Sequence, residues 1–273
     1  MDTETAVASH YRNPRLEQSI LEALRSTGHD PEHLEPDDLL AVDQFHIGGV
    51  QAARDIALGA GIGPGSTVLD IGSGLGGPAR LFAHHFGADV VGVDLTPEFV
   101  DTATSLTRRA GLTEKVAFVQ GSALDLPFAD EEFDVVTLLH VGMNIADKPA
   151  VFREASRVLK PGGVLAINDV MHIGDGEIVY PLPWATSAEI SFPATPDEYT
   201  TALGEAGFTV ATTRNLRSEG IEFAARGPSH GEPPPALGMH LVLGPEGRIG
   251  MGNLLAAMTA GTLAPVEMIA RLR

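Results

Sequence analysis

The sequence feature that most constrains the fold is the stretch from residue 68 to residue 78, VLDIGSGLGGP. An apolar run ends there in a carboxylate, and a cluster of glycines follows before a helical pattern begins. Glycine lets the backbone turn sharply and leaves no side chain between the backbone and a ligand, while the first amide groups of the next helix point into the gap. The stretch therefore predicts a strand, a tight turn and a helix that can hold a nucleotide-like molecule.

The spacing Gly72-x-Gly74-x-x-Gly77 also occurs in dinucleotide sites, so the glycines alone do not identify the ligand. Asp94 closes the next apolar run 20 residues after Gly74, the distance at which an acid on the second strand meets a ribose. Asp70 precedes the first glycine, where it would repel a pyrophosphate but would suit a cofactor whose near end is a cationic amino acid. Asp94 is compatible with either kind of ligand, whereas Asp70 favours a cofactor with a cationic amino acid end.

The stretch from 68 to 76 resembles the first motif of class I S-adenosylmethionine (SAM)-dependent methyltransferases. The segment Val93-Asp94-Leu95-Thr96 resembles their second-strand motif. Three further stretches agree with that family, at residues 121–128, 133–136 and 157–163. Five motifs in order are far more specific than one glycine pattern. Within the family, the sequence most resembles small-molecule enzymes such as the quinone C-methyltransferases and the sarcosine and dimethylglycine N-methyltransferases.

The resemblance implies an α/β fold with a doubly wound, Rossmann-like seven-stranded sheet, an N-terminal helical cap and a helical insert near the C-terminus. We expect the cap over residues 1–60 and the methyltransferase domain over 61–273, in which 173–195 form a substrate-side wall and 216–262 the insert. The resemblance also implies S-adenosyl-L-methionine as cofactor. The expected reaction is in-line methyl transfer to an oxygen, nitrogen or carbon atom of a small, partly apolar molecule.

Apolar runs and turn residues predict the strands of the sheet along the chain. They are expected at 67–71, in a run that ends at Asp94, and at 116–120, 133–139, 163–170 and 208–215. Residues 266–271 fit a seventh strand or the end of a helix, and we favour the strand. We expect residues 1–11 to be a loose tail and 228–235 a loop. An amphipathic helix over 14–25 either covers the cofactor mouth or only packs on the domain.

Ligands of such sheets bind beyond the carboxyl ends of the strands. The residues expected to contact the cofactor there are Asp70, Gly72, Ser73, Gly74, Asp94, Leu95, Ser122, Ala123 and His140. After the third strand the family commonly has an acid that accepts a hydrogen bond from the adenine amino group, and this chain has Ser122. Either the serine bonds the adenine more weakly or the backbone of Ala123 does so.

Two histidines are candidates for the catalytic base. His140 follows the fourth strand, where the family places groups near the transferred methyl, and His46 falls in the segment that in the family faces the substrate. An imidazole that faces a cleft can take a proton at neutral pH. We take His140 as the first candidate and His46 as the second, with a structural histidine bonded to a backbone carbonyl as the alternative for each.

Substrate contacts are expected from His46, Asn144, Trp184 and Met239. Trp184 belongs to a proline and aromatic segment, and methionines recur towards the C-terminus, which suits an apolar pocket, with plain packing as the alternative. Asn168, Asp169 and His172 are of metal-ligand type, but their arrangement does not match that of the magnesium-dependent catechol-type enzymes. We therefore expect no metal.

Composition limits the partners. The 18 Lys and Arg against 36 Asp and Glu give a formal charge of −18, which opposes nucleic acid and anionic membrane surfaces. The chain has no cysteine, and therefore no disulfide framework, thiolate nucleophile or cysteine zinc site. We see no signal peptide and no apolar run long enough to span a bilayer. We expect a cytoplasmic protein with a small-molecule substrate, and a homodimer is left open.

Two other functions share part of this pattern. An NAD-dependent oxidoreductase also uses the glycines and Asp94, although Asp70 and residues 157–163 argue against it. A non-catalytic cofactor-binding protein of the same fold would keep the first motif without turnover.

Overall fold

The computed structural model describes residues 3–226, 235–244 and 246–273. The expected loop at 228–235 lies almost wholly outside the described residues. Seven strands form one sheet in the order β3-β2-β1-β4-β5-β7-β6. This confirms the expected doubly wound, seven-stranded sheet. Their bounds are β1 (Thr67–Ile71), β2 (Asp89–Asp94), β3 (Val116–Gln120), β4 (Phe133–Leu139), β5 (Leu159–His172), β6 (Phe208–Asn215) and β7 (Leu263–Leu272).

The first five strands run parallel, and β7 runs antiparallel to both β5 and β6. The expected seventh strand is thus confirmed and is longer than residues 266–271. In β1 the residues Val68, Leu69 and Ile71 are all buried, because a parallel sheet is covered on both faces. Asp70 is the one carboxylate in this apolar run, and it reaches the carboxyl end of the strand.

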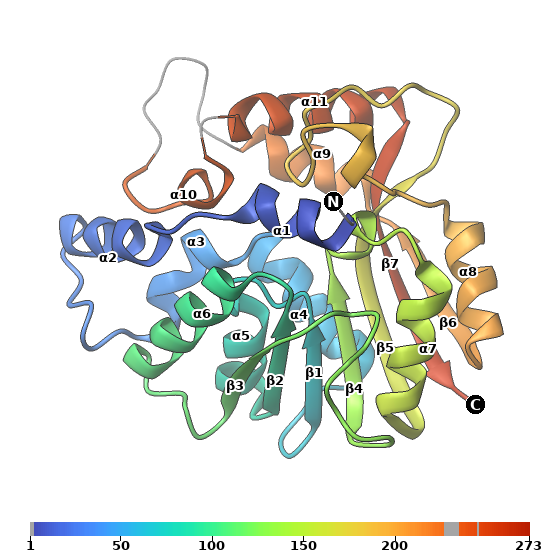
Figure 1. Ribbon diagram of the computed structural model, residues 1–273, viewed down its shortest axis with the longest axis horizontal. Helices are drawn as coiled ribbons and strands as arrows, with labels where there is room; N and C mark the ends of the chain where they lie inside the picture. The colour runs from blue at the N-terminus through green and yellow to red at the C-terminus, as the bar shows by residue number, and fades with distance from the viewer. Residues whose placement is uncertain (1–2, 227–234, 245) are drawn as a thin grey trace.

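Helices cover both faces of the sheet (Figure 1). Apolar side chains of α4 (Gly49–Ala60) and α5 (Gly77–Phe86) pack in one core cluster, and those of α7 (Lys148–Val158) and α8 (Pro196–Glu205) pack in the cluster on the other face. The remaining helices are α1 (Thr3–Tyr11), α2 (Leu16–Ser26), α3 (Leu40–Asp43), α6 (Pro97–Arg109), α9 (Arg217–Ala225), α10 (His240–Leu243) and α11 (Gly247–Ala260). In Figure 1, α1 crosses above the strand ends and α11 lies beyond it. None of the described helices has the length and apolar character needed to cross a membrane.

The N-terminal segment differs from the expectation in two ways. Residues 3–11 form the helix α1 rather than a loose tail, because Val7 and Tyr11 find apolar partners above the strand ends. The expected helix near 14–25 exists as α2, but it does not cover the cofactor mouth. Its apolar face packs against Phe99 and Leu106 of α6, so the packing alternative is correct.

Candidate active site

The glycine turn between β1 and α5 is held to the end of β2. The amide of Gly72 donates to the carbonyl of Val93 at 2.7 Å, and the amide of Gly74 donates to Asp94 Oδ2 at 2.8 Å. Gly72 has a φ of 70°, and a Cβ there would lie 2.2 Å from the side chain of Val141. Only glycine meets both the left-handed backbone and this close approach. The turn therefore presents bare backbone to the space above the strands.

Asp70 points into this space from the end of β1 with only 1% of its surface exposed. Its Oδ1 accepts a hydrogen bond from the Thr137 hydroxyl at 2.7 Å, whereas Oδ2 has no partner among the described residues. Burial raises the pKa of Asp70 to about 7, a shift that the Thr137 hydroxyl opposes and the charge of Asp94 supports. A buried carboxylate oxygen without a partner is costly, and a cationic ligand group would satisfy it.

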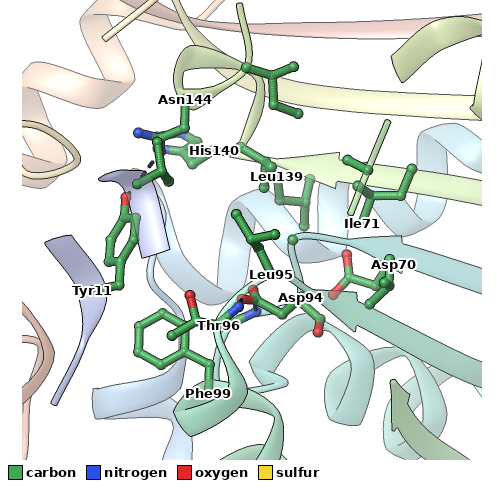
Figure 2. Close-up of a pocket in the computed structure, with 18 of the residues that line it drawn as sticks. Tyr11, Asp70, Ile71, Asp94, Leu95, Thr96, Phe99, Leu139, His140 and Asn144 are labelled. Atoms are coloured by element: carbon green, nitrogen blue, oxygen red, sulfur yellow. Dashed lines mark hydrogen bonds between the residues drawn. The ribbon is translucent and has the colours of Figure 1, made fainter. Parts of the chain in front are cut away.

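Asp94 fixes the loop on either side of it. Its Oδ1 accepts from the amide of Thr96 at 2.8 Å while its Oδ2 holds Gly74. Burial raises the pKa of Asp94, and the two backbone donors oppose that shift. Each oxygen keeps a second lone pair, so the carboxylate can still accept from a pair of hydroxyls on a ligand. Figure 2 shows Asp70 and Asp94 on neighbouring strands at the same edge of the sheet.

A cavity of about 260 Å³ opens above these strand ends. Most of the expected cofactor contacts line it, namely Asp70, Gly72, Ser73, Gly74, Asp94, Leu95, Ala123 and His140, and it also contacts His46 and Asn144. Ser122 does not line it, because its hydroxyl donates to the carboxylate of Glu4 in α1. Ala123, the other residue named at this position, does line the cavity.

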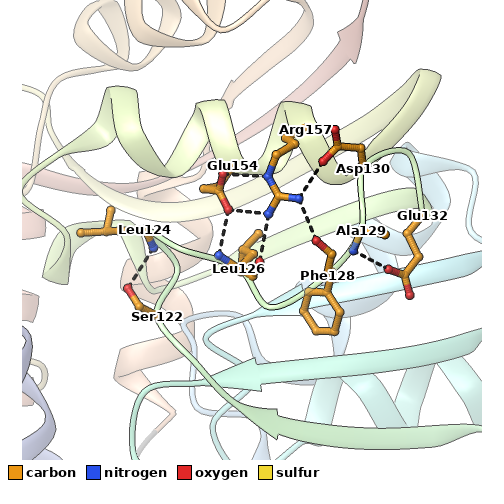
Figure 3. A network of polar contacts seen from close by, with 9 residues as sticks. All are labelled: Ser122, Leu124, Leu126, Phe128, Ala129, Asp130, Glu132, Glu154 and Arg157. Atoms are coloured by element: carbon orange, nitrogen blue, oxygen red, sulfur yellow. Dashed lines mark hydrogen bonds and ion pairs between the residues drawn. The ribbon is translucent and has the colours of Figure 1, made fainter.

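The loop after β3 that carries Ala123 is fixed by an arginine from α7 (Figure 3). The Arg157 guanidinium donates to the carbonyls of Leu126 and Phe128 and pairs with Glu154 and Asp130. The hydrogen bonds that Arg157 donates to Glu154 and Asp130 raise the pKa of Arg157, so it stays charged. The two sequence motifs at 121–128 and 157–163 are thus parts of one polar network that shapes the cavity wall.

Helix α1 covers the cavity, which sequence reasoning missed. Tyr11 packs on Phe99 with ring centroids 5.6 Å apart, and its hydroxyl donates to Asn144 Oδ1 at 3.1 Å (Figure 2). Asn144 in turn donates to the carbonyls of Trp184 and Ile190. The only signal for this arrangement in the sequence was the spacing of Val7 and Tyr11 by one helical turn, which is too short a pattern to place a helix.

The two candidate histidines lie side by side with ring centroids 6.1 Å apart. His46 Nε2 lies 3.0 Å from the carbonyl of Gly49, so Nε2 carries the proton and Nδ1 is the acceptor. His140 has a left-handed φ of 55°, its amide donates to the carbonyl of Asn168, and its Nε2 has no partner among the described residues. Burial lowers the pKa of His46 to about 4 and that of His140 to about 3. Both rings are therefore neutral at pH 7.

A second, smaller cavity of about 30 Å³ adjoins the first. Tyr11, Phe45, His46 and His140 line both cavities. The rest of its wall is apolar and includes the expected substrate contacts Trp184 and Met239, together with Met143, Phe223, Met251 and Leu254. The structure thus gathers all four expected substrate residues around two adjoining spaces, with Asn144 in the larger one.

The polar residues at the carboxyl end of β5 do not converge on one point. The Tyr199 hydroxyl donates to Asp169 at 2.5 Å, and His172 Nε2 faces the carbonyl of Gly176. Burial raises the pKa of Asp169 to about 6, and the Tyr199 hydroxyl opposes the shift. The hydrogen bond between Tyr199 and Asp169 joins α8 to β5. Within the described ranges, metal-ligand spacing occurs only on the exposed surface, at Asp37, His84 and His85.

Residues 69–167 match the family model described as a methyltransferase domain. The fold and strand order described above agree with that match. These residues form a methyltransferase domain. Solved structures of the same fold include a geranyl diphosphate methyltransferase, with a TM-score of 0.72 at 20% identity over 98% of both chains. The [4+2]-cyclase SpnF is also similar, with a TM-score of 0.63 at 22% identity over 94% of both chains. At these identities the likeness concerns the fold alone.

Curated relatives of the methyltransferase domain are more similar in sequence. The erythromycin 3''-O-methyltransferase of Saccharopolyspora erythraea is 36% identical over 63% of this chain and 60% of that protein. The arsenite methyltransferase of Halobacterium salinarum is 35% identical over 67% of this chain and 49% of that protein. The matches therefore span between about half and three-fifths of the length of these relatives.

Proposed function

We propose that the protein is a SAM-dependent methyltransferase that acts on a small molecule. The observation that carries the proposal is the unpartnered, buried Oδ2 of Asp70, which faces a cavity framed by the glycine turn and Asp94. A ligand with a cationic amino acid end and a ribose would satisfy both carboxylates at once. The match to a methyltransferase domain and the names of the curated relatives support the same function.

The residues around the cavity divide the work of binding. Asp70 would receive the ammonium group, Asp94 the ribose hydroxyls, and Ala123 with Leu95 the adenine. A bound SAM supplies an electrophilic methyl carbon, because that carbon is attached to a sulfonium. The protein has to align the acceptor atom with this carbon and exclude water, which the cover formed by α1 favours. His140, or His46 as the second candidate, would take the proton that the acceptor loses.

Isothermal titration of the protein with SAM, with its demethylated product and with NAD tests the proposal. We expect micromolar binding of the first two and none of NAD, because Asp70 would repel a pyrophosphate and no arginine or lysine among the described residues lines the cavity. Binding of NAD alone would favour the oxidoreductase alternative. The [4+2]-cyclase SpnF has a similar fold, so a reaction other than methyl transfer is an alternative. A measurement of methyl transfer to an acceptor distinguishes the two.

The affinity for SAM should fall with acidity. Because the pKa of Asp70 is about 7, its carboxyl is mostly ionised at pH 8 and mostly protonated at pH 6. A protonated Asp70 cannot attract an ammonium group, so the affinity should be about tenfold lower at pH 6 than at pH 8. Titrations at the two values measure this, and Asp70→Asn should remove the dependence. The raised pKa also means that Asp70 lowers the folding stability as the pH rises from about 4, where the unfolded carboxyl ionises, to about 7, where the folded one does.

Asp94→Asn should weaken SAM binding about 10- to 100-fold. Both oxygens of Asp94 accept from backbone amides, so an asparagine would turn its NH2 group against one of these donors and lose the charge. Asp89→Asn is the matched control, because Asp89 begins the same strand and pairs only with the exposed Lys115. Calorimetric affinities for both variants give the comparison. An unchanged affinity in Asp94→Asn would remove the ribose assignment.

We also propose that the protein works in the cytoplasm on a small molecule of secondary metabolism, without a nucleic acid partner. The formal charge of −18 and the erythromycin methyltransferase among its relatives support this. The division into a cap over 1–60 and a domain over 61–273, with 173–195 and 216–262 on the substrate side, is likewise a proposal. So is a homodimer, which sedimentation of the purified chain would test.

A further inference from the structure

We infer that the smaller cavity is the acceptor site, and that it takes an uncharged, largely apolar molecule with a hydroxyl group while rejecting phosphorylated acceptors. The inference rests on the proposed function, because it assigns the larger cavity to SAM. Three features support it. They are the apolar wall of the smaller cavity, the polar groups at the junction of the two cavities, and a lining in which the described residues include no lysine or arginine.

The junction between the cavities is where a methyl group would cross. Tyr11, Phe45, His46 and His140 face both spaces, whereas Asp70 and Asp94 face only the larger one. A ligand that reaches from the smaller cavity into the larger one therefore passes these four side chains. The two imidazoles and the Tyr11 hydroxyl are the polar groups among them, and the Tyr11 hydroxyl already donates to Asn144.

The wall away from the junction is apolar and adaptable. Trp184 is 2% exposed and contributes the largest side chain, with its indole Nε1 donating to Ser191 Oγ at 3.0 Å. Met143, Met239 and Met251 come from three separate elements around it. The space measures only about 30 Å³, so an acceptor enters by displacing side chains. Methionine is unbranched and has three rotatable bonds, which makes it well suited to such rearrangement.

The charges around both cavities oppose an anion. No lysine or arginine among the described residues lines either cavity, and carboxylates such as Glu4, Asp70 and Asp94 line the larger one. The buried cations nearby are already bonded, since Lys148 donates to the carbonyls of Ile145 and Phe192 and Arg80 pairs with Asp43. Placing a phosphate in the smaller cavity would bury its charges without a partner, which is expensive.

A metal ion held by the protein could offset a phosphate, but the wall does not supply its ligands. The one group of described residues with metal-ligand spacing, Asp37, His84 and His85, is exposed and includes the last turn of α5. The glycine turn lies at the other end of that helix. A geranyl diphosphate methyltransferase of the same fold has been solved with Mg²⁺ and its diphosphate substrate. The fold is therefore shared, while the charge of the acceptor site here points to another class of acceptor.

The histidines fit a hydroxyl. His46 Nδ1 is available to accept, since His46 Nε2 donates to the Gly49 carbonyl, and His140 Nε2 has no partner among the described residues. In the transfer an oxygen lone pair forms the new O–C bond, the C–S bond breaks with its electron pair going to sulfur, and the hydroxyl proton goes to an imidazole nitrogen. The products are a methyl ether, S-adenosylhomocysteine and one proton. An alkylated hydroxyl is strongly acidic, so even a weakly basic imidazole can take its proton.

Trp184 gives a direct test, because it is the only tryptophan of the chain and lines the cavity. The protein, saturated with S-adenosylhomocysteine, is titrated with three alcohols (geraniol, decanol and 4-nonylphenol) and with the phosphate monoester of each. Tryptophan emission and calorimetry are followed together, with and without millimolar Mg²⁺. We expect saturable binding of at least one alcohol, and its phosphate ester to bind about 100-fold more weakly or not at all under both conditions.

A charge placed in the wall should invert this preference. Met251→Lys is expected to weaken binding of the alcohol about tenfold and to strengthen binding of its phosphate ester. Ile249→Lys is the matched control on the same helix, since Ile249 is 58% exposed, and it should change neither.

Equal binding of an alcohol and its phosphate ester in the unaltered protein would overturn the inference, and so would the absence of binding by all three alcohols. Phosphate binding that appears only with Mg²⁺ would also overturn it and would indicate a metal-assisted anion site. SAM binding is measured separately by calorimetry. If SAM binds and the alcohols do not, the acceptor inference fails and the proposed function stands; if the alcohols bind and SAM does not, the proposed function fails.

Discussion

Replacing His140 by asparagine is expected to slow methyl transfer about 10²- to 10⁴-fold while leaving the affinities for SAM and for the acceptor nearly unchanged. The imidazole lies at the junction of the two cavities and is neutral, because burial lowers the pKa of His140 to about 3. Asparagine tolerates the left-handed backbone at this position, with its φ of 55°, but cannot take up a proton. The rate should fall because the acceptor keeps its proton, and not because binding is lost.

The rate of S-adenosylhomocysteine formation with the alcohol that binds most tightly measures this effect. His46→Asn tests the second candidate, and His84→Asn, on the exposed last turn of α5, is the control that should change nothing. A wild-type rate in His140→Asn together with a slow His46→Asn would transfer the role to His46. Wild-type rates in both would show that neither ring takes the proton and that their packing is structural.

Arg80→Met is expected to lower the free energy of unfolding by about 3 to 5 kcal/mol. Arg80 and Asp43 form an ion pair at 2.8 Å in which both side chains are 1% exposed. The guanidinium also donates to the carbonyl of Leu75 at 2.6 Å and to the hydroxyl of Thr107 at 2.9 Å. Methionine would fill much of the space but would leave the Asp43 carboxylate buried without its cation. The loss should shrink as the pH falls, since burial already raises the pKa of Asp43 and a protonated carboxyl carries no charge.

Urea denaturation at several pH values measures this loss. Lys115→Met is the matched control, because it breaks an exposed pair with Asp89 and should cost less than about 1 kcal/mol. The double variant Asp43→Leu with Arg80→Met should recover part of the stability by removing the stranded charge. A loss below about 1 kcal/mol in Arg80→Met would mean that the pair is nearly neutral for folding. Asp43 also lines the larger cavity, so SAM affinity should fall together with stability in Arg80→Met.

Most strands of the sheet and one edge of the site could be predicted from the sequence alone. The strands at 67–71, 116–120, 133–139 and 208–215 could be predicted because buried strands are continuous apolar runs bounded by turn residues. Asp70 and Asp94 stood out for the same reason, since each is a carboxylate at the end of such a run. The parallel order of the strands then brings their carboxyl ends to one edge, which is why both residues line one cavity.

What covers that edge, and how the site is charged, depends on contacts between segments that are far apart in the chain. Tyr11 is placed by Asn144 and Phe99, which lie far along the chain, and no local pattern in α1 announces those partners. His46 and His140 meet because the segment before α4 folds back over the end of β4, and their pKa values follow from burial by both ends of the chain. Periodicity and motif spacing describe neighbours in sequence, whereas cavity volume, desolvation and charge balance depend on contacts between distant segments.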